Sequence, residues 1–146
     1  MRNALFLIAL AASGIAQAES CTINVKSNDA MQFDQHSLTV SSTCKTITVN
    51  FSHTGKLPAQ AMGHNLVIAA AADYQAVAQD GLKAGLANDY VKPGDPRVIA
   101  STKIIGGGQS TSTTFPGNKL KAGGAYKVFC TAPGHLAMMT DQLVVK

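Results

Sequence analysis

Apolar and polar residues alternate in short runs along most of the chain, which is the pattern of half-buried β-strands. Gly, Pro, Asn and Asp separate these runs, as turn residues do. The runs that predict strands are 21–26, 37–41, 46–51, 65–69, 97–103, 112–115, 125–129 and 142–146. Eight short strands in one domain predict an all-β fold, a Greek-key sandwich of two sheets.

One segment departs from this alternation. Residues 70–83 are rich in alanine and end just before Gly85, a composition that favours a short helix. We therefore expect a short helical flap around residues 71–85, inserted between two strands and packed on the sandwich.

The N-terminal residues have the pattern of an export signal. Met1-Arg2-Asn3 is a short basic start, residues 4–12 are apolar, and residues 16–18 (AQA) form a small-x-small cleavage site. An N-terminal anchor helix is the less favoured alternative, because the apolar run is too short to span a membrane comfortably. We expect a signal peptide at 1–18 and a single mature domain at 19–146.

The charge of the mature segment excludes some classes of partner. Of the 12 Lys and Arg residues only Arg2 lies in the signal, and all 8 acidic residues are in the mature segment, so its formal charge is +3. The basic residues are scattered and aromatic residues are few, so we expect no nucleic-acid partner. No Ser/His/Asp arrangement or carboxylate pair suits hydrolysis, and Gly106-Gly107-Gly108 lacks the Lys-Ser/Thr of a phosphate loop. We expect no enzymatic turnover.

The three cysteines are an odd number for a protein expected in an oxidising compartment. Cys21 and Cys44 lie in strand-like segments near the mature N-terminus, whereas Cys130 lies among metal-ligating residue types. We therefore predict a disulfide between Cys21 and Cys44 and a free Cys130. Sequence alone leaves the other two pairings open. Each of them would place Cys130 in a disulfide, and the spacing of His135 and Met139 would then have no explanation.

Residues 130–139 (CTAPGHLAMM) contain the most informative chemistry of the chain. They place Cys130, His135 and Met139 in a Cys-x4-His-x3-Met spacing. A thiolate, two imidazoles and a weak axial thioether are the ligands of a blue-copper electron-transfer site. The loop lacks only the second imidazole, which His64 can supply. The sequence therefore predicts one copper ion that carries single electrons.

Each residue of this kind also has an ordinary structural explanation. A lone Cys is usually a small core residue, and a lone Met usually fills a gap in the core. Met138 competes with Met139 for the axial position, and the three-residue gap after the loop histidine favours Met139. We expect His53 to be a hydrogen-bonded histidine at a strand end, and His36 to be a solvated surface residue.

Several blocks of the chain, taken in order, resemble the azurins, the bacterial periplasmic members of the blue-copper (cupredoxin) proteins. The blocks are 28–33 (NDAMQF), 62–65 (MGHN), 71–73 (AAD), 89–93 (DYVKP), 97–100 (RVIA) and the loop 130–139. The resemblance covers residues 19–146. It implies a cupredoxin-like sandwich with a helical flap, a disulfide near the N-terminus and one type 1 copper in the periplasm.

The resemblance also implies roles for individual residues around the copper. The strong ligands would be His64, Cys130 and His135, with Met139 as an axial ligand and the Gly63 carbonyl as a second weak axial contact. The backbone amides that would donate to the thiolate sulfur belong to Asn65 and Ala132.

In azurins the exposed edge of the loop histidine lies in an apolar patch, through which redox partners dock transiently. The matching residues here are Met31, Leu57, Ala61, Met62, Ala132, Pro133 and Ala137. The implied partners are c-type cytochromes, nitrite reductase-like acceptors and periplasmic dehydrogenases. We expect a monomer without stable membrane association. The alternative with the same ligands is a copper-binding or copper-buffering protein without a dedicated electron-transfer role.

The chain departs from the usual azurin at three positions. It has no Trp, and Leu66 stands where a buried Trp is common. Ala132 replaces a Phe of the copper loop, and Ser101 replaces a surface His. The smaller Leu66 leaves space that its neighbours must fill or that remains as a cavity, and Ala132 thins the cover over the metal. None of the three is a predicted ligand.

Overall fold

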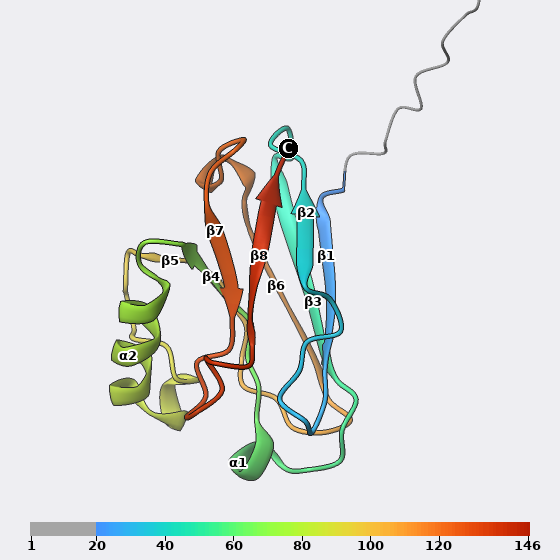
Figure 1. Ribbon diagram of the computed structural model, residues 1–146, viewed down its shortest axis with the longest axis vertical. Coiled ribbons are helices and arrows are strands. Elements are labelled where there is room, and N and C mark those ends of the chain that lie inside the picture. The colour runs from blue at the N-terminus through green and yellow to red at the C-terminus, as the bar shows by residue number, and fades with distance from the viewer. Residues whose placement is uncertain (1–19) are drawn as a thin grey trace, which may run out of the picture.

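Two β-sheets packed face to face form the body of the computed structural model, which describes residues 20–146 (Figure 1). The first sheet has the order β1 (Thr22–Ser27), β3 (Thr46–His53), β6 (Ser110–Pro116). The second has the order β2 (Ser37–Val40), β8 (Thr140–Val145), β7 (Tyr126–Phe129), β4 (Val67–Ala70), β5 (Val98–Ser101). The predicted eight-stranded sandwich is confirmed. The predicted signal peptide at 1–18 lies outside the described residues.

Both sheets are mixed. β1 pairs with β3 in parallel and β2 pairs with β8 in parallel, whereas the remaining pairs are antiparallel. In β1, β2 and β3 every second residue is buried, which is why their sequences alternate so clearly. The largest side chains buried between the sheets include Ile47, Phe51, Leu66, Ile68 and Leu143.

Strand β4, which lies between β7 and β5, is buried on both faces, because a helix covers the outer face of its sheet. Helix α2 (Tyr74–Ala84) lies beside β4 and β5 in Figure 1 and buries Val77, Ala78 and Gly81. These residues form a second small core with residues of β4 and with Phe129 of β7. The predicted flap is therefore present, and its helix begins at Tyr74 because β4 continues to Ala70 and residues 71–73 form a turn.

Three shorter helices complete the elements of the described part of the chain. They are α1 (Ala59–Met62), η1 (Leu86–Asn88) and η2 (Gly117–Lys119). No helix among the described residues is long and apolar enough to cross a membrane.

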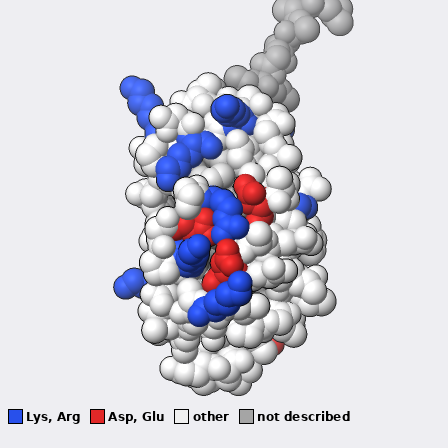
Figure 2. Space-filling model, turned by 90° about the vertical axis from the view of Figure 1, so that its left-hand side faces the viewer, with Lys and Arg blue, Asp and Glu red and all other residues white. Residues whose placement is uncertain are grey.

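Ionic contacts fasten α2 to the loop that precedes β5. The Arg97 guanidinium donates to the carboxylate of Asp95 at 2.6 and 2.9 Å and to that of Asp80 at 2.7 Å. Figure 2 shows that Lys, Arg and acidic side chains gather together on this face of the molecule. The hydrogen bonds from Arg97 lower the pKa of Asp95 to about 2, so this nearly buried carboxylate stays ionised down to strongly acidic pH.

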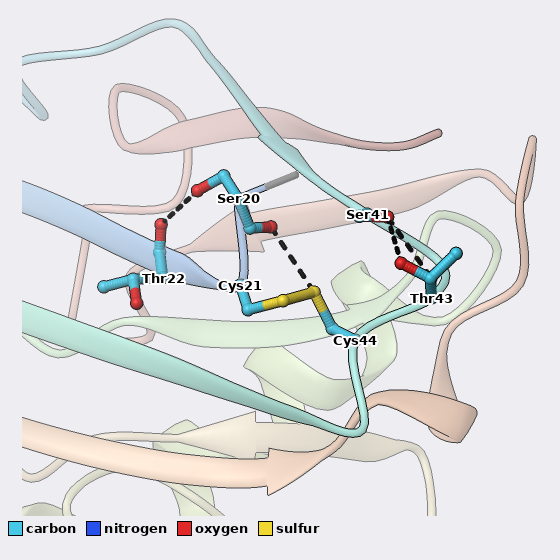
Figure 3. The surroundings of a disulfide bond; sticks show 6 residues. All are labelled: Ser20, Cys21, Thr22, Ser41, Thr43 and Cys44. Carbon is cyan, nitrogen blue, oxygen red and sulfur yellow. Dashed lines mark hydrogen bonds between the residues drawn. A yellow bond between two sulfur atoms is a disulfide. The ribbon is translucent and has the colours of Figure 1, made fainter. Parts of the chain in front are cut away.

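A disulfide between Cys21 and Cys44 closes one end of the sandwich (Figure 3). It joins the residue before β1 to the turn before β3, with the two Cα atoms 5.6 Å apart. This is the predicted pairing, and it leaves Cys130 as a buried free cysteine. Cys130 follows the end of β7, which points toward the opposite end of the sandwich (Figure 1).

Candidate metal centre

Two distant stretches of chain bring a thiol and two imidazoles together at this second end. His64 forms an isolated antiparallel bridge with Ile105, with hydrogen bonds of 3.0 and 2.9 Å between their backbones. Cys130 follows β7 directly, and its amide donates to the Met139 carbonyl, just before β8, at 3.0 Å. Strand pairing therefore fixes both the first imidazole and the thiol.

His135 reaches the same point through a tight loop. Gly134 has a φ of +80°, a conformation that suits glycine and reverses the chain before the histidine. The His135 amide donates to the Ala132 carbonyl at 3.1 Å, and the Met139 amide donates to the His135 carbonyl at 2.8 Å. These bonds close the loop between β7 and β8 over the thiol.

The three ligand-type atoms lie close together and away from solvent. Cys130 Sγ is 3.6 Å from His135 Nδ1 and 3.9 Å from His64 Nδ1, and the two ring nitrogens are 3.0 Å apart. His64 and Cys130 are fully buried, and His135 is 7 % exposed. In the described part of the chain this is the one group of three or more His, Cys, Asp or Glu residues found close enough to hold a metal ion.

Burial keeps the two imidazoles in the neutral form that binds a metal ion and opposes ionisation of the thiol. It lowers the pKa of His64 to about 4 and also lowers the pKa of His135, so both rings are neutral near pH 7. Burial raises the pKa of Cys130 to about 11, although the backbone N–H groups of Ala132 and Asn65 act in the opposite direction. A thiolate here needs a cation beside it, and a sulfur with two imidazole nitrogens is a donor set that suits copper.

A hydrogen bond at one ring nitrogen of His64 leaves the other nitrogen free to bind a metal ion. Nε2 donates to the Asn28 carbonyl at 2.8 Å, so the unprotonated Nδ1 faces the thiol. His53 stacks on the same ring, with centroids 4.6 Å apart, and is itself buried. Its Nε2 donates to the Met62 carbonyl at 2.9 Å, and its Nδ1 accepts from the Gly55 amide at 3.0 Å. His53 is thus a hydrogen-bonded histidine at a strand end, as expected.

The other residues singled out in the sequence lie in different environments. Met139 is fully buried, whereas Met138 is 61 % exposed. Gly63 is buried where any Cβ would collide with the Ala59 carbonyl, so the backbone there requires glycine. The His36 side chain is largely exposed and lies 3.5 Å from a carboxylate oxygen of Asp141.

The residues predicted to form an apolar docking patch differ in exposure. Leu57 is 42 % exposed, and Ala61, Pro133 and Ala137 are also exposed. Those that lie deeper are Met31 and Met62, which are half-buried, and Ala132, which is buried.

A buried polar network beside the thiol was not predicted from the sequence. The Asn65 side chain accepts from the Thr131 amide at 2.9 Å and donates to the Thr131 hydroxyl and to the Asp89 carbonyl, each at 2.7 Å. Asn65 and Thr131 are both buried. An amide side chain directly before the apolar run 66–69 was the available signal, because buried amides are normally fully hydrogen-bonded.

The Asp89 carbonyl, which accepts a hydrogen bond from the Asn65 side chain, belongs to a strained turn. Asp89 and Tyr90 have φ values of +53° and +52°, a left-handed conformation that non-glycine residues seldom adopt. Each such residue costs about 1–3 kcal/mol and persists where its surroundings impose it.

Comparisons with known proteins agree with this geometry. Residues 19–146 match the model of the copper binding proteins, plastocyanin/azurin family. The chain is 55 % identical to an azurin of Pseudomonas denitrificans over 126 residues, which cover 86 % of this chain and 98 % of that protein. It is 48 % identical to an azurin of Pseudomonas aeruginosa, with 98 % and 96 % covered. A solved azurin, Az-iso2 from the methylotroph Methylomonas sp. strain J, superposes with a TM-score of 0.83 at 46 % identity, covering 87 % of this chain and 98 % of that chain.

Proposed function

The chain belongs to the plastocyanin/azurin family of copper-binding proteins, and we propose that it carries single electrons in the periplasm between soluble redox partners. Its azurin relatives and its His, Cys, His and Met residues make it a blue-copper electron carrier with one type 1 copper ion. We also propose which residues hold the ion and where partners dock.

We assign the ligands from burial and distance. The strong ligands are His64, Cys130 and His135, whose donor atoms lie within 4.8 Å of one another. Met139 would supply a thioether as the fourth ligand, an assignment supported by its complete burial. The carbonyl oxygen of Gly63 would supply a further weak contact to the ion.

Bound copper supplies a centre that takes up and releases one electron by alternating between Cu(II) and Cu(I). The residues of this chain keep the surroundings of that centre constant. β4 and β7 hold the two sides of the cluster, the Asn28 carbonyl fixes the His64 ring, and two backbone amides donate to the Cys130 sulfur. Because packed and hydrogen-bonded ligands move little, each transfer requires little reorganisation.

We propose that partners dock on the apolar patch around His135. Leu57, Pro133 and Ala137 are exposed, and Met62 is partly exposed, so an apolar surface is available for close contact. Small apolar contacts suit transient complexes that must dissociate after each transfer. The partners we propose are c-type cytochromes, nitrite reductase-like acceptors and dehydrogenases of the periplasm.

The observation that carries the proposal is the buried thiol of Cys130 facing two neutral imidazoles in an azurin-like fold. Adding Cu(II) to the mature protein should produce an intense visible thiolate-to-copper absorption. Cys130→Ser should abolish it, and Met138→Leu, which changes only the exposed neighbour of Met139, should retain it. Retention of the absorption in Cys130→Ser would contradict the ligand assignment.

Rapid mixing then separates an electron carrier from a copper buffer. The reduced protein should transfer its electron to an oxidised c-type cytochrome within the dead time or the first seconds of mixing. A protein that shows the visible absorption but no transfer to any of several cytochromes would be a copper buffer instead.

A further inference from the structure

Helix α2 packs on the residues that flank the thiol on both sides in the sequence. The Tyr74 ring meets the Phe129 ring edge to face, with centroids 5.8 Å apart. At Gly81 the helix lies so close to the strand end that a Cβ would be 3.7 Å from Thr131 Cβ. Phe129 and Thr131 are the neighbours of Cys130, so the flap supports the segment that carries the sulfur.

Gly81 also allows α2 to touch the strained turn. A Cβ at this position would collide with the carbonyl oxygen of Tyr90 and lie 3.0 Å from its carbonyl carbon. Both of these are backbone atoms, which cannot swing aside as the end of a flexible side chain can. The helix therefore reaches this turn only because residue 81 has no side chain.

The turn is held from several directions. The Tyr90 amide donates to the Gly85 carbonyl at 3.0 Å, which ties the turn to the end of α2. The Asp89 carboxylate accepts from the Ile104 amide at 2.8 Å, which ties it to the segment before the His64 bridge. Its backbone carbonyl accepts from Asn65 at 2.7 Å. Contacts on all sides explain how two left-handed non-glycine residues persist here.

We propose that Gly81 is a positioning residue for the thiol of Cys130. Its close contact fixes the left-handed turn at Asp89, the turn fixes the Asn65 side chain, and Asn65 fixes the amide and hydroxyl of Thr131. The direction of the sulfur thus depends on a helix residue that contacts none of the proposed ligands. This inference rests on the proposed function, since it concerns the geometry of the same metal centre.

The experiment compares Gly81→Ala with Ala76→Gly, the reverse exchange at an exposed position of the same helix. Helix propensity predicts that Gly81→Ala strengthens α2 and that Ala76→Gly weakens it. A positioning role for Gly81 predicts a different result. Gly81→Ala should speed hydrogen exchange of the Thr131 amide, which donates to Asn65, about tenfold in the metal-free protein. Ala76→Gly should leave that rate unchanged.

The copper-loaded proteins give a second readout. Gly81→Ala should shift the visible absorption, the copper EPR splitting and the reduction potential, whereas Ala76→Gly should shift none of them. Unchanged Thr131 exchange and spectra in Gly81→Ala would overturn the inference. Equal changes in both variants would overturn it too, because they would reflect helix stability alone.

If Gly81→Ala does not fold, Asp89→Ala tests the later steps of the proposal, which run from the turn through Asn65 to Thr131. It removes the carboxylate that accepts from Ile104 and leaves the helix contact intact. It should also speed exchange of the Thr131 amide, and an unchanged rate would overturn the inference. Hydrogen exchange is measured without metal, so its result does not depend on copper binding. A failure to bind copper would therefore contradict the proposed function without contradicting this inference.

Discussion

Replacing Cys21 and Cys44 together with alanine tests how much stability comes from covalent closure of one end of the sandwich. The disulfide joins residues 23 positions apart. The chain-entropy relation for a loop of this length gives about 3.4 kcal/mol at 25 °C. With an unfolding entropy of about 2.1 cal/mol/K per residue over the mature chain, this loss lowers the melting temperature by about 13 °C.

Loss of packing adds to the loss of the cross-link, because Cys44 is buried and Cys21 is half-buried. The matched control is the wild-type protein with its disulfide reduced, which keeps both sulfur atoms but lacks the cross-link. Reduced wild type should therefore show the entropic loss alone. The alanine variant should be less stable than reduced wild type by about 1 kcal/mol for the missing sulfur contacts.

Denaturant unfolding of the metal-free proteins measures these differences. The copper-loaded alanine variant should keep the visible absorption of the wild type, because the disulfide and the metal cluster lie at opposite ends of the sandwich (Figure 1). A stability loss below about 1 kcal/mol would refute the loop-closure reasoning. An altered absorption would show that the two ends are coupled.

Three further predictions concern the core and the charged groups. Burial lowers the pKa values of His64 and His135, so the unfolded chain binds more protons than the folded chain below pH 6.5. The metal-free protein should therefore lose stability as the pH falls from 6.5 towards 4, and denaturant midpoints that stay constant over this range would contradict the shifts. Leu66→Ala should cost about 3 kcal/mol in denaturant unfolding, since this fully buried side chain would leave a cavity, and a cost under about 1 kcal/mol would show that the core collapses into the space. Arg97→Gln should cost about 2 kcal/mol, a value between those of surface and buried ion pairs, because it leaves the nearly buried Asp95 carboxylate without its cation. A calorimetric melting curve that matches the wild type would contradict this last expectation.

The strands were predictable because the sandwich imposes a simple rule on the sequence. Where one face meets the core and the other meets water, as in β1 and β3, burial alternates and the residues alternate with it. Helix α2 was predictable from its alanine-rich composition, but its first residue was not, because residues 71–73 form a turn that alanine tolerates equally well. The four residues of α1 are too few to show a helical period.

The grouping of His64, Cys130 and His135 was predictable for a different reason. Few residue types bind copper, so their spacing in the loop 130–139 is informative even before the chain folds. The hydrogen bonds that support these three residues have no such signal in the sequence. Asn65 and Thr131 are 66 positions apart, and their pairing exists only once β4 and β7 are adjacent. The left-handed turn contains Asp89 and Tyr90, whereas sequence rules assign that conformation mainly to glycine.

The distance along the chain between the first histidine and the thiol has a consequence for maturation. His64 and Cys130 are separated by 66 residues, and the Cys130 amide is held by the residue that precedes the last strand. A chain in which the second sheet has not yet formed therefore has no preformed pocket to offer an ion. We therefore expect copper loading to follow closure of the second sheet, so that a protein that absorbs visible light is one whose final strand has already paired.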